Sequence, residues 1–270
     1  MERLWLMNQS DTGIVVPTLG TRPEYLYQSL KSIRSAGNTL IHIVMPDSAS
    51  LPHEITSDMY DLVVSDPGKG LAAAIHAGLG SFPNSVRFIS WLGDDDLLAM
   101  GSLDKTSQIL RLEDEVVLVF GGCDYINATN QVIFTNHSGR YANPLMRCGP
   151  QLIPQPGSLF RRDSYVSIGG LHTEYKWAFD LDLLIRLSQV GKMRHIDQTL
   201  ASFRWHEDSL SVGGRDGSVR EASLIRKRYL PAYLRPIAGL WEMPMRHAIK
   251  YAGTRVSRRR AAPLTLPHGG

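Results

Sequence analysis

Three consecutive carboxylates at the end of an apolar run constrain this chain more than any other feature. Residues 88–92 are almost all apolar and lead through Gly93 into Asp94, Asp95 and Asp96. Three adjacent acids repel one another and are costly to bury together. At a strand end that faces water they are tolerated, and they suit a hard divalent cation such as Mg²⁺ or Mn²⁺. Two interpretations stay open from this stretch alone: a metal site, or a solvated turn in which one Asp caps the next helix.

Length and composition exclude several classes of protein. A chain of 270 residues is one large domain or two small ones, and its net charge of +3 does not demand a nucleic-acid partner. Its two cysteines, Cys123 and Cys148, form neither a disulfide framework nor a zinc cluster, which fits a reducing cytosol. We expect no signal peptide in residues 1–11 and no membrane span, because no apolar run approaches roughly 18 residues. The expected location is therefore cytoplasmic.

Apolar runs alternate with helical patterns over the first 122 residues. The expected strands are residues 13–18, 40–45, 62–64, 86–92 and 116–120. The expected helices open at Pro23 and stop at Gly37, cover residues 71–79, and cover residues 103–112. This β-α alternation predicts an α/β fold with a mostly parallel sheet and helices on both faces.

The polar residues that follow the expected strands gather at one place. In parallel sheets, ligands bind at the carboxyl ends of the strands. Pro17 with Thr18, Asp47, the loop 68–70 and the acids 94–96 all follow such ends. We expect them to share one sheet edge, and this favours the metal interpretation of the acids.

The pattern changes after Gly122. Residues 124–134 predict a small antiparallel excursion around a turn at 127–130. Residues 136–155 show little periodicity and are interpreted as a mobile or substrate-covering loop. A helix is expected over residues 180–187 and a strand over residues 193–203.

Five segments, taken in order, carry a resemblance to a known family. They are residues 15–18 with Arg22 and residues 29–33; Asp66, residues 69–71, Ala74, His76 and residues 78–79; residues 92–96; residues 160–162, 168–170, 178–182 and 186–187; and residues 203–206 with Ser209 and Ser211. This series, over about residues 13–212, resembles the family 2 glycosyltransferases, which have the GT-A fold. His76 stands where that family usually has Asn, and Pro46 stands where an acid is common, which leaves the nucleotide base open.

The resemblance implies a fold and an activity. The fold would be one GT-A domain over residues 1–235, with a nucleotide-binding half at about 10–122, an acceptor half at about 123–212, and an extension at 236–270. The activity would be a metal-dependent, inverting transfer of a sugar, of the hexosyltransferase type. The donor would be a nucleotide-diphosphate sugar and the acceptor a hydroxyl of a glycan or lipid-linked molecule, in cell-surface polysaccharide or glycolipid synthesis.

The resemblance also implies roles for the acids. Asp95 matches the ligand of Mn²⁺ or Mg²⁺, with His206 as a second ligand. Asp94 and Asp96 would support the metal or contact the nucleotide ribose. Asp180 matches the general base, which must take the acceptor's hydroxyl proton. Helix N-capping by Asp180 and a purely structural His206 stay open as alternatives.

The same comparison places the nucleotide diphosphate among residues of the first three loops: Pro17, Thr18, Arg22, Asp47 and Lys69. Lys69 lies between two glycines before an expected helix N-terminus, where phosphate is favoured. An exposed turn lysine is the alternative for Lys69, and capping of the loop is the alternative for Arg22.

Three other functions are alternatives to this one. Residues 20–23 read Gly-Thr-Arg-Pro, a sequence also found in sugar-phosphate nucleotidylyltransferases, but here no glycine cluster precedes it and no Pro-Lys signature follows. A two-metal phosphohydrolase would need more His and Asp ligands at several strand ends. A catalytically inactive relative that binds nucleotide-sugar or glycan is the third, and the joint presence of Asp95, Asp180 and His206 argues against it.

The last quarter of the chain is strongly basic. From residue 236 onward, arginines alternate with aliphatic and aromatic residues, as in Trp241 and the triple Arg258, Arg259, Arg260. Such a segment suits peripheral contact with the anionic inner face of a membrane. A helix that packs on the domain with a solvated basic face is the other interpretation.

Overall fold

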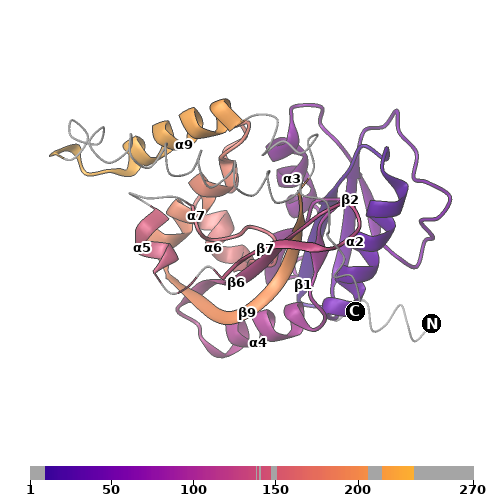
Figure 1. Cartoon of the computed structure of the whole chain (residues 1–270), viewed down its shortest axis with the longest axis horizontal. Coiled ribbons are helices and arrows are strands. Elements are labelled where there is room, and N and C mark those ends of the chain that lie inside the picture. The colour runs from indigo at the N-terminus through magenta and orange to yellow at the C-terminus, as the bar shows by residue number, and fades with distance from the viewer. Residues whose placement is uncertain (1–9, 138, 140, 147–150, 206–214, 234–270) are drawn as a thin grey trace, which may run out of the picture.

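The computed structural model describes residues 10–137, 139, 141–146, 151–205 and 215–233. Its strands are β1 (Thr12–Pro17), β2 (Leu40–Met45), β3 (Leu62–Ser65), β4 (Phe88–Trp91), β5 (Leu97–Leu98), β6 (Val116–Ile126), β7 (Val132–Asn136), β8 (Leu159–Arg161) and β9 (Lys192–Arg204). Its helices are α2 (Pro23–Ala36), α3 (Leu71–Gly80), α4 (Ser102–Leu112), α5 (Ala142–Met146), α6 (Arg162–Ser167), α7 (Phe179–Val190) and α9 (Arg215–Tyr229). The prediction of an α/β fold is confirmed (Figure 1).

One mixed sheet runs through the molecule in the order β3-β2-β1-β4-β8-β6-β9-β5, and β7 pairs with β6. Strands β3, β2, β1 and β4 are parallel, and so are β6 and β9. Strand β8 is antiparallel to both β4 and β6, so it joins the two parallel groups. Helix α2 connects β1 to β2 and helix α3 connects β3 to β4 in the first group, whereas long-range pairing builds the second.

The alternation of side chains along β1 separates two apolar cores. Val15 packs with residues of α3 and α7 on one face of the sheet, while Ile14 and Val16 pack with α2 and α4 on the other. Helix α3 lies very close to the sheet at Gly78, where an added Cβ would lie 2.6 Å from Val44 Cγ2. Both faces of the sheet are therefore covered, as the apolar, β-branched strands predict.

Parts of the second half differ from the sequence expectation. Strand β6 does not stop at Phe120 but continues through Gly121 and Gly122 to Ile126. The glycines permit this because a Cβ at Gly121 would lie 2.5 Å from Gln198 O of the neighbouring β9. Within the interval interpreted as a loop, residues 136–155, the short helix α5 buries Ala142 and Met146 completely.

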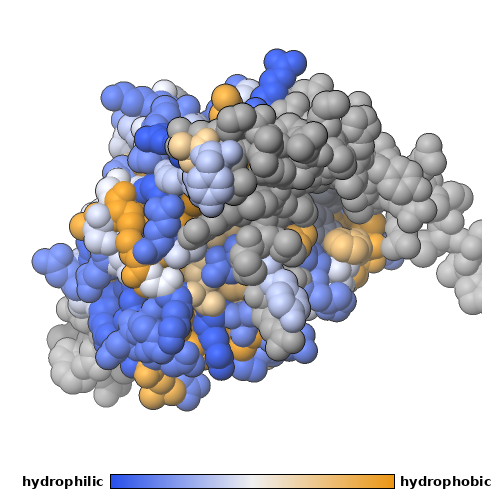
Figure 2. All heavy atoms as spheres, turned by 90° about the vertical axis from the view of Figure 1, so that its left-hand side faces the viewer, coloured by the Kyte–Doolittle hydropathy of each residue, from blue (hydrophilic) through white to orange (hydrophobic). Residues whose placement is uncertain are grey.

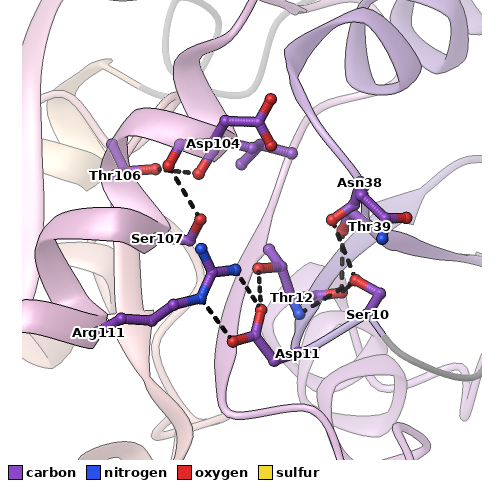
Figure 3. A network of polar contacts seen from close by, with 10 residues as sticks. Ser10, Asp11, Thr12, Asn38, Thr39, Asp104, Thr106, Ser107 and Arg111 are labelled. Atoms are coloured by element: carbon purple, nitrogen blue, oxygen red, sulfur yellow. Dashed lines mark hydrogen bonds and ion pairs between the residues drawn. The ribbon is translucent and has the colours of Figure 1, made fainter.

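A polar network ties the elements together at the opposite edge of the sheet, where β1 begins (Figure 3). Arg111 of α4 donates from Nε and Nη2 to the two carboxylate oxygens of Asp11, at 2.8 and 2.6 Å. Burial raises the pKa of Asp11, but the hydrogen bonds and charge of Arg111 outweigh it, and the pKa lies below its ordinary value. Ser10 Oγ and Thr39 Oγ1 both donate to Thr12 O, so α4 and the start of β2 are fixed to the same strand end.

The surface of the described part is ordinary for a folded domain. No helix among the described residues is long and apolar enough to cross a membrane. Figure 2 shows one face as mostly hydrophilic, with hydrophobic residues scattered over it where it is coloured. The basic segment 236–270 lies outside the described residues.

His42 generates a test of the packing on β2. It is buried at 4% exposure, stacks on Phe82 at 4.1 Å between ring centroids, and its Nδ1 lies 2.6 Å from Ser81 Oγ. Burial lowers the pKa of His42 to about 4, against the charge of Asp61. Because the folded state holds this ring neutral, its contribution to the free energy of unfolding is complete above pH 6.5 and is lost as the pH falls towards 4.

We predict that this loss reaches about 3 kcal/mol. Urea unfolding at pH 7 and pH 4.5 should show a shallower pH dependence for His42→Gln than for the wild type. His53→Gln is the matched control, because the His53 side chain is 93% exposed. Equal pH dependence in His42→Gln and the wild type would contradict the neutral, buried ring.

Candidate active site

The carboxyl ends of β1, β2, β3 and β4 meet at one edge of the sheet. Thr18 N donates to Val44 O, Asp66 N donates to Met45 O, and Leu92 N donates to Val15 O, each at 2.9 Å. These bonds lead the chain out of the sheet just before the loops that carry Asp47, Lys69 and the three acids. The structure therefore brings the predicted residues to the predicted edge.

Asp94 and Asp95 share one guanidinium. Arg22 Nη2 lies 2.5 Å from Asp94 Oδ1, and Arg22 Nη1 lies 2.6 Å from Asp95 Oδ2. Thr18 Oγ1 donates to the other oxygen of Asp94 at 2.6 Å and accepts from Gly20 N at 3.0 Å. The loop after β1 and the loop after β4 are thus joined by charge-assisted hydrogen bonds, which are the stronger kind.

Asp96 points into the protein. Its side chain is buried, and Oδ1 accepts from Arg204 N at 2.9 Å. Burial and the adjacent charge of Asp95 raise the pKa of Asp96 well above its ordinary value. Among the three acids, Asp96 is therefore the one that anchors the turn to β9, while Asp95 is more exposed.

Arg204 is the site residue that sequence reasoning missed. Its side chain is fully buried, and Nε donates to Asp95 O at 2.8 Å, Nη1 donates to Asn127 O at 3.0 Å, and Nη2 donates to Gln28 Oε1 at 3.2 Å. The guanidinium also lies 4.3 Å from the centre of the Tyr25 ring. One side chain thus joins α2, the acidic turn, the β6–β7 turn and β9. Residues 203–206 belong to the family resemblance, which implies a role for His206 and none for Arg204.

Asp47 and Lys69 lie on exposed loops at the same edge. Asp47 is in the turn after β2, and Lys69 is in the loop before α3. Gly68 N donates to Asp66 Oδ1 at 2.9 Å, which shapes this second loop. Pro17 is the last residue of β1 and is half-buried. The exposed side chains of Asp47 and Lys69 are accessible to a ligand at this edge. His206, the predicted second metal ligand, lies outside the described residues.

Asp180 lies in the first turn of α7. It accepts from Gln151 Nε2 at 2.8 Å through Oδ2 and from Leu181 N at 2.8 Å through Oδ1. Burial raises the pKa of Asp180, and these two hydrogen bonds oppose the shift without cancelling it. The N-cap residue of α7 is Ala178 and not Asp180, so the Asp180 carboxylate does not act as the N-cap.

Tyr125 places Asp180 and the acidic turn in one neighbourhood. The pKa of Tyr125 is raised by burial first, and the charges of Asp96 and Asp180 both add to the rise. Its ring also packs against Phe203 and Trp205, at centroid distances of 5.4 and 5.8 Å. Tyr125 is therefore near enough to both Asp96 and Asp180 for their charges to act on its hydroxyl.

Asp182, two residues beyond Asp180, has a structural role. It is fully buried and receives Arg186 Nε at 2.7 Å and Tyr229 Oη at 2.8 Å. His172 Nδ1 lies 3.0 Å from its Oδ2. Asp182 thus connects α7 to the preceding loop and to α9.

The carboxylate oxygens at the acidic turn suit a divalent cation that the protein binds through only one or two ligands. Carboxylate oxygens are what Mg²⁺ and Mn²⁺ prefer. No cluster of three or more His, Cys, Asp and Glu side chains that could enclose a metal occurs within the described ranges. The described residues therefore suit a cation that takes one or two carboxylates and completes its shell with phosphate and water, as Mg²⁺ commonly does.

Comparison with solved structures identifies the architecture. The fold is that of the GT-A glycosyltransferases. TarS of S. aureus, residues 1–349, superposes with a TM-score of 0.58 at 13% identity, over 87% of this chain and 71% of that one. A longer TarS structure gives 0.55 at 12% identity, over 79% of this chain and 39% of TarS.

A third solved structure with this GT-A fold is a complex. The mannosyltransferase PcManGT from Pyrobaculum calidifontis, bound to GDP-Man and Mn²⁺, gives a TM-score of 0.61 at 15% identity, over 95% of this chain and 76% of that one. No family model and no curated protein matches the sequence. The comparisons thus show the GT-A fold, and the assignment to family 2 remains a prediction from the motifs.

The buried guanidinium of Arg204 generates a stability prediction. Arg204→Gln would leave Asp95 O and Asn127 O without their charged donor, and we expect it to lower the free energy of unfolding by about 3 kcal/mol. Urea denaturation measures this loss.

Arg194→Gln is the control for the same exchange at a surface site. The Arg194 side chain is 58% exposed and its ion pair with Glu113 spans 3.8 Å, so its loss should stay within about 0.5 kcal/mol. Equal losses in the two variants would show that Arg204 does not hold the site together.

Proposed function

We propose that this protein is a glycosyltransferase that moves a sugar from a nucleotide-diphosphate sugar to a hydroxyl of a glycan or lipid-linked acceptor. The observation that carries the proposal is that, on a GT-A fold, Asp96 of the acidic turn and the partly buried Asp180 both lie near enough to Tyr125 for their charges to act on its hydroxyl. The acidic turn would serve the leaving diphosphate, and Asp180 would serve the incoming hydroxyl.

The donor side follows from the loops at the sheet edge. The nucleotide diphosphate would lie across Pro17, Thr18, Asp47 and Lys69, with the Lys69 ammonium and the Arg22 guanidinium as its cationic partners. Asp95 would hold a divalent cation, Mn²⁺ or Mg²⁺, with His206 as a second ligand and Asp94 and Asp96 supporting the turn. When bound, such an ion neutralises charge that develops on the leaving diphosphate.

Asp180 would take the proton of the acceptor. As the acceptor oxygen bonds to the anomeric carbon, its O–H bond breaks and the proton passes to the Asp180 carboxylate. The bond between the anomeric carbon and the β-phosphate oxygen breaks in the same step, and the nucleoside diphosphate leaves. A single displacement of this kind inverts the anomeric configuration. The raised pKa of Asp180 makes its carboxylate a stronger base than an exposed aspartate.

Ligand-dependent thermal stability tests the donor site. We expect one of UDP, GDP, dTDP and CDP, with Mn²⁺, to raise the melting temperature by about 5 °C or more, because a ligand of the folded state stabilises it by mass action. Asp95→Asn should abolish the metal-dependent part of the shift.

Asp114→Asn is the control, because the Asp114 side chain is 94% exposed. It should keep the full shift. A wild type that responds to no nucleotide would contradict the donor site, and an unchanged shift in Asp95→Asn would contradict the role of Asp95.

Asp180→Asn separates turnover from donor binding. We expect kcat for nucleotide release with acceptor to fall roughly 10²- to 10⁴-fold, because the neutral amide cannot accept the proton. The nucleotide-dependent thermal shift should persist, since Asp180 lies on the acceptor half. Activity within a few-fold of the wild type would exclude Asp180 as the base. A wild type that binds nucleotide-sugar but never turns it over would instead favour the catalytically inactive relative.

A further inference from the structure

Helix α9 packs directly on the helix that carries Asp180. Ile225 of α9 is fully buried in the same core as Leu181 and Leu184 of α7. In Figure 1, α9 lies along the side of the molecule where α7 and α5 are found. Arg226 Nε also donates to Met146 O of α5 at 3.2 Å. This helix is therefore an integral layer of the acceptor half.

Glu221 of α9 binds the backbone just before α7. Its Oε1 accepts from Lys176 N at 2.9 Å, and its Oε2 accepts from Trp177 N and Ala178 N, both at 2.6 Å. The first N–H groups at a helix start have no partner within the helix, and a negative charge there is favoured by the helix dipole. Lys176 and Trp177 precede the helix and Ala178 is its N-cap residue, so Glu221 fixes the segment that leads into α7 and places its negative charge at the helix start.

Two more contacts fix α9 against this segment. An added Cβ at Gly217 would lie 2.7 Å from the ring of Trp177, so the helix backbone and the indole are in close contact. Tyr229 Oη donates to Asp182 Oδ1 at 2.8 Å. Asp180 lies between the residues held by Glu221 and the one held by Tyr229. A shift of α9 would therefore move the carboxylate that the proposed mechanism uses.

We propose that Glu221 is a positioning residue for Asp180, which it serves by fixing the backbone 176–178 from which α7 starts. This inference rests on the proposed role of Asp180 as the base. It assigns a function in catalysis to α9, a helix that carries none of the residues expected from the sequence.

The charge of Glu221 has a second effect. Burial raises the pKa of Asp180, and among the neighbouring charges Glu221 adds to the rise. The Asp180 carboxylate accepts hydrogen bonds from Gln151 and from Leu181 N, and it interacts electrostatically with Glu221 of α9 and the Tyr125 hydroxyl of β6. Because Gln151 and Tyr125 stay unchanged, replacing Glu221 by Gln lowers the pKa of Asp180.

The test compares Glu221→Gln with Glu174→Gln in the full-length protein. Glu174 is an exposed glutamate in the loop that leads to α7. Its exchange removes the same charge without removing the hydrogen bonds to residues 176–178. For Glu221→Gln we expect kcat to fall roughly 10- to 100-fold with the KM for donor unchanged, because small displacements of a catalytic group are costly. The acid limb of the pH–kcat profile should move to lower pH. Glu221→Asp, which keeps the charge, should keep the limb in place.

Two readouts do not depend on turnover. Amide hydrogen exchange at residues 176–178 should accelerate in Glu221→Gln and not in Glu174→Gln, and the ¹³C carboxyl signal of Asp180 should titrate at lower pH. Faster exchange with an unchanged kcat, pH profile and Asp180 titration would overturn the proposal and leave Glu221 as a structural cap. If the wild type transfers no sugar at all, the proposed function fails, and the exchange and titration data still decide whether Glu221 controls Asp180.

Discussion

Three adjacent carboxylates can stand at one strand end here because the loop after β1 holds two of them and β9 holds the third. Thr18 and Arg22 hold Asp94 from the loop after β1, and Arg22 also holds Asp95. The backbone N–H of Arg204 holds Asp96, more than a hundred residues away in sequence. Like charges at this spacing would otherwise repel one another. The acidic turn is thus the point at which the first loop, the fourth strand and the last strand must all be in place.

Arg204 extends this constraint from the turn to the whole sheet. The first group of strands folds through short β-α-β connections, while β6 and β9 pair over a long sequence separation. The buried guanidinium bonds both to Asp95 O in the first group and to Asn127 O at the end of β6. Because a buried guanidinium needs its partners to offset the loss of hydration, the two halves are held in one relative position. In the second half of the chain, Glu221 and Asp182 likewise hold α7 through hydrogen bonds to distant residues.

The local pattern of the sequence was sufficient for the first half of the fold. The predicted β2 and α2 match their observed bounds, and β1, α3 and α4 differ by one residue at one or both ends. The hydrophobic periodicity and the turn residues at the ends predict these elements. The parallel order of the strands then brings the loop residues to one edge of the sheet. The short strands β5 and β8 escaped prediction because only pairing with distant strands makes them strands. Strand β6 continues through Gly121 because β9 packs closely against it there. The local sequence of β6 carries no information about this distant partner.

The site shows the same division between local and distant information. The residue types and order of the acids, Thr18, Arg22 and Asp180 were readable, and the structure places them at the expected edge and helix. The partners were not readable: Arg22 with Asp95, Gln151 with Asp180, and Glu221 with residues 176–178 each join segments far apart in sequence. Arg204 was overlooked because an arginine beside a tryptophan and a histidine gives no local sign that its guanidinium will be buried.

The most direct measurement is a crystal structure of the protein grown with Mn²⁺ and a nucleoside diphosphate, with an anomalous difference map at the manganese edge. The donor-site assignment predicts one strong peak within about 2.5 Å of the Asp95 carboxylate, in contact with the diphosphate at the edge formed by Thr18 and Lys69. A nucleotide bound elsewhere, or a diphosphate at this edge held by Arg22 and Lys69 with no peak at Asp95, would contradict it.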